Sequence, residues 1–307
     1  MRAGGKRALA RALAQIEASP ETPETLALLD AAFRDPRGWV LGLTGPPGVG
    51  KSTLTSALIR AYRRENLSVG VIAVDPSSRR TGGALLGDRT RIEVDPEDEG
   101  VFVRSMAARD HLGGLAALTT AATVLMRAAF DRVIVETVGV GQSETDIERL
   151  GDTVLLCIQP GSGDTLQFMK AGIAEIPDVA VVTKGDLGVL ADRAVADLRS
   201  AVMMGPQAAS GWSAPIVRTA AGGDGKVDAL TEAIERHRRW LDAEGRLQAR
   251  RHAQASSWLR EAIREQHGRM GLRRAESTKG ALALASDESP FARLAELEIK
   301  RVLSIYY

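Results

Sequence analysis

Seven short apolar runs alternate with helical patterns between residues 39 and 219, and this alternation constrains the fold more than any other feature of the sequence. The runs lie at residues 39–44, 69–75, 101–104, 133–137, 154–158, 179–184 and 216–219. The chain between them has room for crossover helices, and such strand–helix–strand repeats are typical of a parallel sheet with right-handed connections. We therefore predict an α/β fold with a mostly parallel central sheet flanked by helices, and with binding loops at the carboxyl ends of the strands.

The composition is that of an ordinary folded protein. The chain has 307 residues, 44% of them hydrophobic, and its 40 Lys and Arg residues balance 39 Asp and Glu residues. A net charge of +1 gives no general attraction to nucleic acid or membranes, and no apolar stretch approaches the roughly 20 residues of a spanning helix. The one cysteine, Cys157, is expected in the core. We predict a cytoplasmic protein that binds neither nucleic acid nor membranes.

The strongest motif is GPPGVGKST at residues 45–53, which matches G-x-x-x-x-G-K-[ST] completely and lies between a predicted strand and a helical pattern. Glycines are needed there because backbone N–H groups must wrap closely around phosphate oxygens, and the helix N-terminus adds a favourable dipole. Lys51 would bridge the β- and γ-phosphates, and the Ser52 hydroxyl would bind Mg²⁺. The predicted nucleotide-binding residues of this loop are Gly45, Pro46, Gly48, Val49, Gly50, Lys51, Ser52 and Thr53.

Three acidic residues near predicted strand ends or in glycine-rich loops are candidates to complete a metal site with Ser52. They are Asp75 in VDPSS, Asp88 in GGALLGDRTR and Glu136 in ETVGVGQ. An acid in a loop is usually solvated or caps a helix, so each one alone is a weak signal. Their placement after successive strands, on the edge where a nucleotide would bind, favours Mg²⁺ coordination instead.

The tetrapeptide TKGD at residues 183–186 ends the predicted strand 179–184 and indicates which base is bound. The Asp186 carboxylate can accept hydrogen bonds from guanine N1 and N2 together, whereas adenine offers no such pair of donors. The Lys184 stem can cover the base, and Thr219 with Ala220, after the last strand, can contact its O6. The motif is weak alone, but its position after a complete phosphate loop favours guanine over adenine.

Helical patterns flank this core at both ends. Residues 7–34 are predicted to form a helical hairpin, residues 226–272 carry a long charged amphipathic pattern, and Ser289 with Pro290 is predicted to open a terminal helix. We expect an N-terminal helical extension at 1–38, a nucleotide-binding domain at 39–225 and a C-terminal helical extension at 226–307. The terminal helix could dock in its own chain or on another subunit.

With these elements placed, the chain resembles the MeaB/ArgK family of GTPases, the chaperones of adenosylcobalamin-dependent acyl-CoA mutases. The resemblance covers nearly the whole chain and rests on motifs that match in order: GPPGVGKST, VIAVDPSS, GGALLGDRTRI, HLGGLA, ETVGVGQSE, PGSGDTLQFMKAGIAEIPD and R-R-H-A-Q-x-x-x-W at 250–258. It implies a SIMIBI-type P-loop fold, GTP or GDP with Mg²⁺ as ligands, and a homodimer whose arm is the C-terminal extension. It also implies that Asp75, Asp88 and Glu136 are the Mg²⁺ and switch acids, and that residues 159–170 form a third switch.

Three residues depart from the family pattern. Thr183 stands in place of the usual Asn of N-K-x-D and so lacks an amide that buttresses the phosphate loop, although a hydroxyl can partly substitute. Asp110 stands where relatives have Gly, which places a carboxylate near the predicted nucleotide face. Gly185 adds backbone freedom to the base-recognition loop.

The resemblance implies slow GTP hydrolysis that a partner mutase accelerates. This hydrolysis would gate cofactor loading and protect a mutase of the methylmalonyl-CoA or 2-hydroxyisobutyryl-CoA type. Catalysis would be mainly positioning and electrostatics. Gly139 would contact the nucleotide. No Gln directly follows it, and Gln142 lies three positions further along. A partner could recruit Arg104, Arg109 or Lys170 to the γ-phosphate. The predicted catalytic residues are Lys51, Asp88, Glu136, Gln142 and Lys170.

Three alternatives stay open on the sequence. A P-loop phosphotransferase would need an acceptor site with a base, and none is evident. A nickel-insertion GTPase needs clustered His or Cys, which four scattered histidines and one cysteine do not supply. A structural adaptor would bind GTP without turnover.

Overall fold

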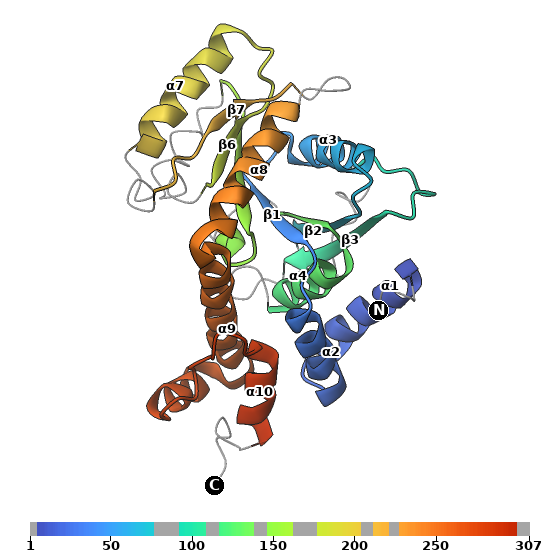
Figure 1. The fold of residues 1–307 in the computed structure, drawn as a ribbon, viewed down its shortest axis with the longest axis vertical. Helices are drawn as coiled ribbons and strands as arrows, with labels where there is room; N and C mark the ends of the chain where they lie inside the picture. The colour runs from blue at the N-terminus through green and yellow to red at the C-terminus, as the bar shows by residue number, and fades with distance from the viewer. Residues whose placement is uncertain are drawn as a thin grey trace.

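The computed structural model describes residues 5–76, 92–108, 117–137, 146–161, 177–203, 211–220 and 227–299 (Figure 1). A seven-stranded sheet forms its centre, with the strand order β3-β2-β4-β1-β5-β6-β7, and every ladder is parallel. All seven apolar runs of the sequence are strands, and the predicted parallel sheet is confirmed. The strands are β1 (Trp39–Thr44), β2 (Val69–Pro76), β3 (Val101–Ala108), β4 (Arg132–Glu136), β5 (Thr153–Ile158), β6 (Val179–Val182) and β7 (Ile216–Arg218).

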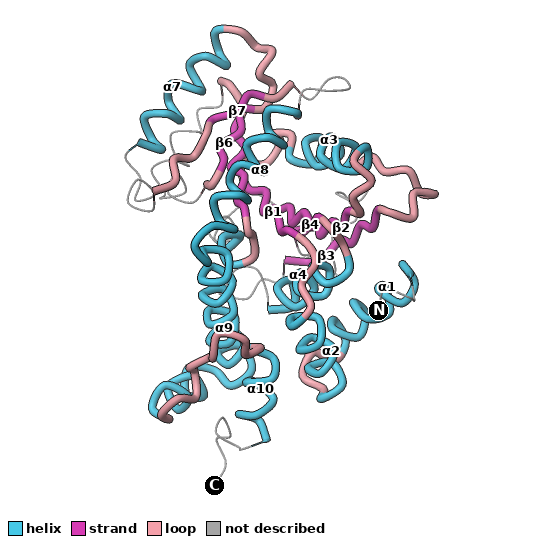
Figure 2. The backbone as a smooth tube through the Cα atoms, viewed as in Figure 1, coloured by secondary structure: helices cyan, strands magenta, loops and turns pink. Residues whose placement is uncertain are grey.

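Helices cover both faces of the sheet (Figure 2). Because side chains alternate along a strand, Leu41 of β1 packs on one face with α3 (Lys51–Arg64) and α8 (Asp228–Asp242), while Val40 faces the opposite layer. That second layer contains α1 (Gly5–Ala18), α2 (Pro23–Arg34), α4 (Ala117–Ala129), α7 (Val189–Met203), α9 (Arg246–Ser277) and α10 (Pro290–Ile299). None of the helices that the structure describes is long and apolar enough to cross a membrane.

The described part of the terminal helix packs in its own chain. Ser289 caps α10, since its hydroxyl accepts hydrogen bonds from the Phe291 and Ala292 N–H groups, as the sequence predicts. The Phe291 ring lies 4.4 Å from that of Trp258 in α9 and 6.3 Å from that of Phe33 in α2, measured between centroids. The N-terminal hairpin of α1 and α2 is also confirmed, so both ends of the described chain join one helical layer.

Two ion pairs, each between a buried carboxylate and a part-buried arginine, join α9 to the amino-terminal edge of the sheet. Arg251 makes two hydrogen bonds to Asp152, and Arg250 makes two to Asp178. Each carboxylate also accepts a backbone N–H from a neighbouring strand, from Val40 and Val154 respectively. Because every partner is hydrogen-bonded, these buried charges fix where α9 crosses the sheet.

His237 of α8 is fully buried at the same edge. Its Nδ1 lies 2.9 Å from the Thr153 hydroxyl, and its ring centroid lies 4.7 Å from that of Trp212 and 5.6 Å from that of Trp240. Burial, and to a smaller extent the Arg250 charge, lowers the pKa of His237 from its ordinary 6.5 to about 4, although the Asp178 carboxylate, with its Oδ1 3.3 Å from Nε2, acts in the opposite direction. The ring is therefore neutral in the folded protein at neutral pH.

The free energy of unfolding should fall by about 3 kcal/mol as the pH drops from 6.5 to 4. The folded pKa lies below the unfolded one, so the contribution of His237 is complete above pH 6.5 and is lost toward pH 4, where the unfolded chain binds the extra proton. Urea unfolding across this range measures the effect. A His237→Gln variant should show a smaller pH slope than the wild type, and equal slopes would contradict the assignment.

Candidate nucleotide-binding site

The predicted site residues gather at the carboxyl edge of the sheet. β1 lies between β4 and β5, and Leu43 is in register with Glu136. The chain leaves β1 at Thr44, forms the loop, and enters α3 at Lys51. The ends of β6 and β7 lie farther along the same edge because all strands are parallel.

The phosphate loop needs glycine at two positions for different reasons. Gly45 has a φ of +137°, and a Cβ there would lie 2.1 Å from the backbone oxygen of Cys157 in β5. Gly50 has a φ of +99° and caps α3 in a left-handed conformation that side chains disfavour. These two residues let the loop lie close against the sheet and turn into the helix.

Lys51 lies across the loop that precedes it. Its side chain is buried, and its Nζ donates to the backbone oxygens of Gly45 at 2.7 Å and Pro46 at 3.0 Å. The ammonium group is thus held where the loop encloses a phosphate. Behind it, burial raises the pKa of the Cys157 thiol to about 12, so this cysteine is a protonated core residue, as predicted.

Glu136 ends β4 beside the first turn of α3 and is only 4% exposed. Ser52 Oγ donates to its Oε1 at 2.7 Å, and Thr55 Oγ1 donates to its Oε2 at 2.9 Å. A hydroxyl and a carboxylate are oxygen donors of the kind that Mg²⁺ prefers, so the chemistry of these residues fits the predicted ion. The part played by Thr55 was not predicted, because a threonine in a helix carries no signal of its partner.

The other predicted acids are placed only in part. Asp75 lies at the carboxyl end of β2, where its backbone pairs with Ala107, and its side chain is outside the described structure. Outside the described residues altogether are Asp88, Arg109, Asp110, Gly139, Gln142 and Lys170. Within the described part of the chain, no three His, Cys, Asp or Glu side chains gather as a metal cluster.

Arg104, a predicted partner-recruited residue, is engaged elsewhere. It lies in the middle of β3, and its guanidinium makes two hydrogen bonds to Glu17 of α1, the shorter at 2.6 Å. This ion pair joins the N-terminal hairpin to the edge strand of the sheet. In this structure Arg104 therefore has a positioning role for α1 and does not reach toward the phosphate loop.

Thr183 ties the base-recognition strand to the phosphate loop. Its buried hydroxyl lies 2.7 Å from the Val49 backbone oxygen and 3.0 Å from that of Ile158, and donates to these carbonyls. The hydroxyl thus makes the link to the phosphate loop that the resemblance assigns to an asparagine amide. One hydroxyl has one hydrogen to share, so this link is weaker than two amide donors would be.

Replacing Thr183 by Val should raise the Kd for GDP about tenfold, because it leaves the Val49 carbonyl of the loop without its donor at a cost of about 1–3 kcal/mol. Isothermal titration calorimetry with GDP measures this. Thr183→Ser keeps the hydroxyl and is the matched control. Equal affinity in the Val variant would show that the hydroxyl does not support the loop.

The loop after β6 is held against the end of β7. Gly185 N donates to the Thr219 backbone oxygen at 2.9 Å, and a Cβ at Gly185 would lie 3.1 Å from the Arg218 Cβ. Lys184 has a φ of +51°, and its Nζ donates to Gln159 Oε1 at 2.6 Å. Asp186 is exposed, and Thr219 and Ala220 lie on the adjoining strand end. Gly185 therefore permits a close approach that brings the predicted base-binding residues together.

The phosphate loop lies between β1 and α3 of a parallel sheet, and Asp186 follows Gly185 beside the end of β7. This arrangement defines the P-loop nucleotide-binding class. Residues 9–272 match the family described as "Methylmalonyl Co-A mutase-associated GTPase MeaB". The chain belongs to the MeaB family and is a GTPase, and the predicted resemblance is confirmed.

Individual relatives agree. A protein of Pyrococcus abyssi is 42% identical over 254 residues, which are 82% of this chain and 78% of that protein. GTPase ArgK of Escherichia coli is 37% identical over 272 residues, covering 87% of this chain and 82% of ArgK. The crystal structure of a LAO/AO transport system kinase superposes with a TM-score of 0.68 at 29% identity, covering 98% of this chain and 94% of that one.

Proposed function

We propose that this protein is a GTP-hydrolysing chaperone of an adenosylcobalamin-dependent acyl-CoA mutase, of the methylmalonyl-CoA or 2-hydroxyisobutyryl-CoA type. The family description names methylmalonyl-CoA mutase as the associated enzyme. The hydrogen bond from Thr183 to Val49 supports the GTPase part of the proposal. It connects the loop at residues 183–186, which the sequence predicts to bind guanine, to the phosphate loop. The sequence has no D-x-H-x-x-G cobalamin motif, so the cofactor would belong to the mutase.

The chain's own residues would divide the work of hydrolysis. Lys51 would neutralise charge on the transferring phosphoryl group, and Asp186 would select guanine. Glu136 would orient the Ser52 hydroxyl and hold Mg²⁺ together with it, with Asp75 and Asp88 completing the site. Bound there, the ion would neutralise charge on the phosphate oxygens. Gln142 and Lys170 are the proposed water-positioning and charge-stabilising residues.

The nucleotide state would be read by the partner. Ordering of loops around the γ-phosphate would bias the mutase between open and closed arrangements, so that loaded and damaged cofactor are distinguished.

We also propose domain boundaries at residues 38 and 225 and a homodimer in which the C-terminal extension is the dimerisation arm. Size-exclusion chromatography with light scattering tests the dimer, and a monomer at micromolar concentration would contradict it.

Phosphate release from GTP, measured with and without the cognate mutase, tests the chaperone role. We expect slow turnover of the protein alone and a clear acceleration by the mutase. Lys51→Met with the mutase present is the control for contaminating phosphatase. No acceleration would overturn the chaperone proposal and leave the GTPase assignment in place.

Phosphotransfer is the second candidate, because the solved relative is named a transport system kinase. GTP labelled at the γ-phosphate separates the two reactions. Free labelled phosphate indicates hydrolysis, whereas label on a protein or small-molecule acceptor indicates a kinase. A protein that binds GTP but transfers no label at all would be an adaptor.

A further inference from the structure

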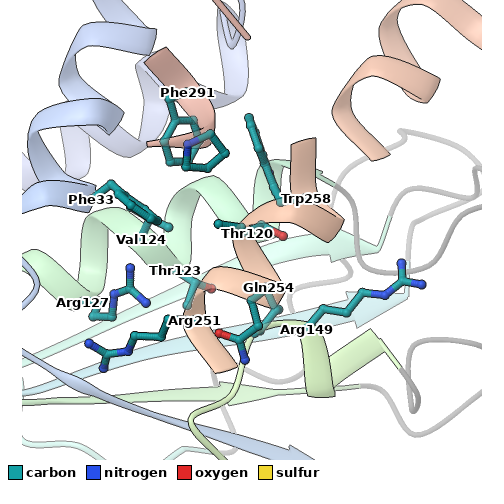
Figure 3. A pocket seen from close by; sticks show the side chains of 13 residues that line it. Phe33, Thr120, Thr123, Val124, Arg127, Arg149, Arg251, Gln254, Trp258 and Phe291 are labelled. Atoms are coloured by element: carbon teal, nitrogen blue, oxygen red, sulfur yellow. The ribbon is translucent and has the colours of Figure 1, made fainter. Parts of the chain in front are cut away.

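A pocket lies in the helical layer on the face of the sheet opposite α3, and the nucleotide site does not include it. It opens between α2, α4, α9 and α10, beside the short helix η2 (Ile147–Arg149), and has an empty volume of about 380 Å³ including its mouth (Figure 3). Aromatic side chains and arginines line the same pocket. Figure 3 shows Phe33, Trp258 and Phe291 around one part of it, and the guanidinium groups of Arg127 and Arg251 toward another.

Arg127 is the unusual member of this lining. It is 6% exposed, and its Nε has no hydrogen-bond partner among the described residues. Its close contact is the ring of Phe33, whose centroid lies 5.8 Å from the guanidinium carbon. Burial, reinforced by the Arg251 charge, lowers the pKa of Arg127 to about 10. Since that value is still above neutral pH, a charged guanidinium is buried here without a carboxylate of its own in the part of the chain that the structure describes.

The carboxylate that acts on Arg127 is already used. Asp152 accepts two hydrogen bonds from Arg251 and one from the Val40 N–H. The buried Arg127 and the part-buried Arg251 thus share this one carboxylate, which leaves one positive charge in excess among these three described side chains. Burying an unpaired charge is costly, so a bound anion with a single negative charge would relieve the imbalance, whereas a dianion would reverse it.

The side chains that line the pocket indicate the chemistry of the uncharged part of the ligand. The pocket is lined by apolar side chains, namely Phe33, Val124, Leu150, Ala255, Trp258 and Phe291, and also by Thr120, Thr123, Arg149 and Gln254. The Thr123 and Gln254 side chains already donate to backbone oxygens. A second hollow continues from it along α4 and α9 to Ala117 at the start of α4, and the two share Thr120, Arg149, Leu150, Gln254 and Trp258. This second hollow is more polar, since Asp146, Ser257 and Glu261 also line it, so the apolar body would lie in the first pocket. A ligand with a small charged head and a short apolar body matches this combination of walls and open mouth.

We propose that this pocket binds a small monocarboxylate, with its carboxylate on the Arg127 guanidinium and its short hydrocarbon chain against the aromatic and aliphatic walls. This site is separate from the phosphate loop, and the proposal does not depend on the function proposed above. Arg127 is a ligand-binding residue in this interpretation, and Arg251 is the residue that keeps Asp152 from neutralising it.

Arg132 provides a matched comparison. It is 7% exposed, lies 5.2 Å from the Tyr62 ring centroid and also has an unpartnered Nε, but its Nη2 donates to Glu235 at 2.7 Å. The two arginines thus share burial, an aromatic neighbour and one unmade hydrogen bond. They differ in that Arg132 has its own carboxylate and does not line this pocket.

Calorimetric titration with sodium butyrate at constant ionic strength tests the proposal, with butyramide and sodium chloride as the other probes. We expect butyrate to bind, and butyramide and chloride not to. Arg127→Met should weaken butyrate binding at least about tenfold, and Arg132→Met should leave it unchanged. Equal binding of chloride, no binding of butyrate, or unchanged binding in Arg127→Met would each overturn the proposal.

Thermal unfolding gives a second readout that needs no ligand. Because Arg127→Met removes an uncompensated buried charge and keeps an unbranched apolar stem, its Tm should be equal to or above that of the wild type. Arg132→Met should lower the Tm, since it separates an ion pair. A lower Tm for Arg127→Met than for Arg132→Met would show that the Arg127 guanidinium stabilises the fold itself, and the ligand site would be rejected.

Discussion

Replacing Asp186 by Asn should weaken GTP binding by about 100-fold and allow xanthosine triphosphate to bind in its place. The carboxylate can accept from guanine N1 and N2 together, and each hydrogen bond to a charged group contributes about 1.5–3 kcal/mol. An asparagine accepts from N1 with its oxygen, but its amide nitrogen faces the guanine amino group, donor against donor. Xanthine has an oxygen at that position and can accept from the amide.

Competition binding with both nucleotides measures the exchange. Asp192→Asn is the matched control, because Asp192 is an exposed carboxylate six residues farther along that pairs with Arg218. It should leave the GTP affinity unchanged. If Asp186→Asn kept its preference for GTP, the base would be recognised elsewhere, and the interpretation of residues 183–186 would be wrong.

The loop at residues 183–186 also shows how much of the site could be predicted from the sequence. Asp186 and Lys184 were predicted from their order after the phosphate loop, and the structure places them beside the end of β7. The effect of Gly185 was not predictable, because it depends on a neighbour from another strand. Only the fold shows that the Gly185 N–H donates to Thr219 and that a side chain there would press on Arg218.

The sheet was predictable because its signal is local. Parallel strands buried on both faces appear as short runs of Val, Leu and Ile, and each run can be recognised without knowing its partner. The same holds for caps such as Ser289, whose hydrogen bonds reach only two or three residues ahead. Both features were therefore found from the sequence.

Contacts between distant residues were not predictable. Arg251 and Asp152 are 99 residues apart, and the stretch at 250–258 was recognised as a family motif without any account of what its arginines bind. The excess charge at Arg127 follows from that same pair, so it could be seen only after the partners of Asp152 were known. Charged residues in a sequence do not show which of them will be buried together.

Replacing Lys51 by Met should lower the rate of GTP hydrolysis at least about 100-fold, because it removes the cation placed at the phosphate loop while keeping an unbranched side chain only one atom shorter. Charge develops on the transferring phosphoryl group, and a preorganised donor in a site shielded from water is worth far more than one in solution. Lys51 is preorganised in this sense, since it is buried and its Nζ is held by the Gly45 and Pro46 carbonyls.

Single-turnover hydrolysis, with the protein in saturating excess over GTP, separates this loss from weaker binding, because all the GTP is then bound. Lys6→Met is the matched control: Lys6 also donates to a backbone oxygen, that of Asp98, but it lies in α1 away from the site. Its turnover should equal that of the wild type. If Lys51→Met hydrolysed GTP at the normal rate while still folded, the charge on the phosphoryl group would have to be neutralised by another cation, and the assignment of Lys51 would fail.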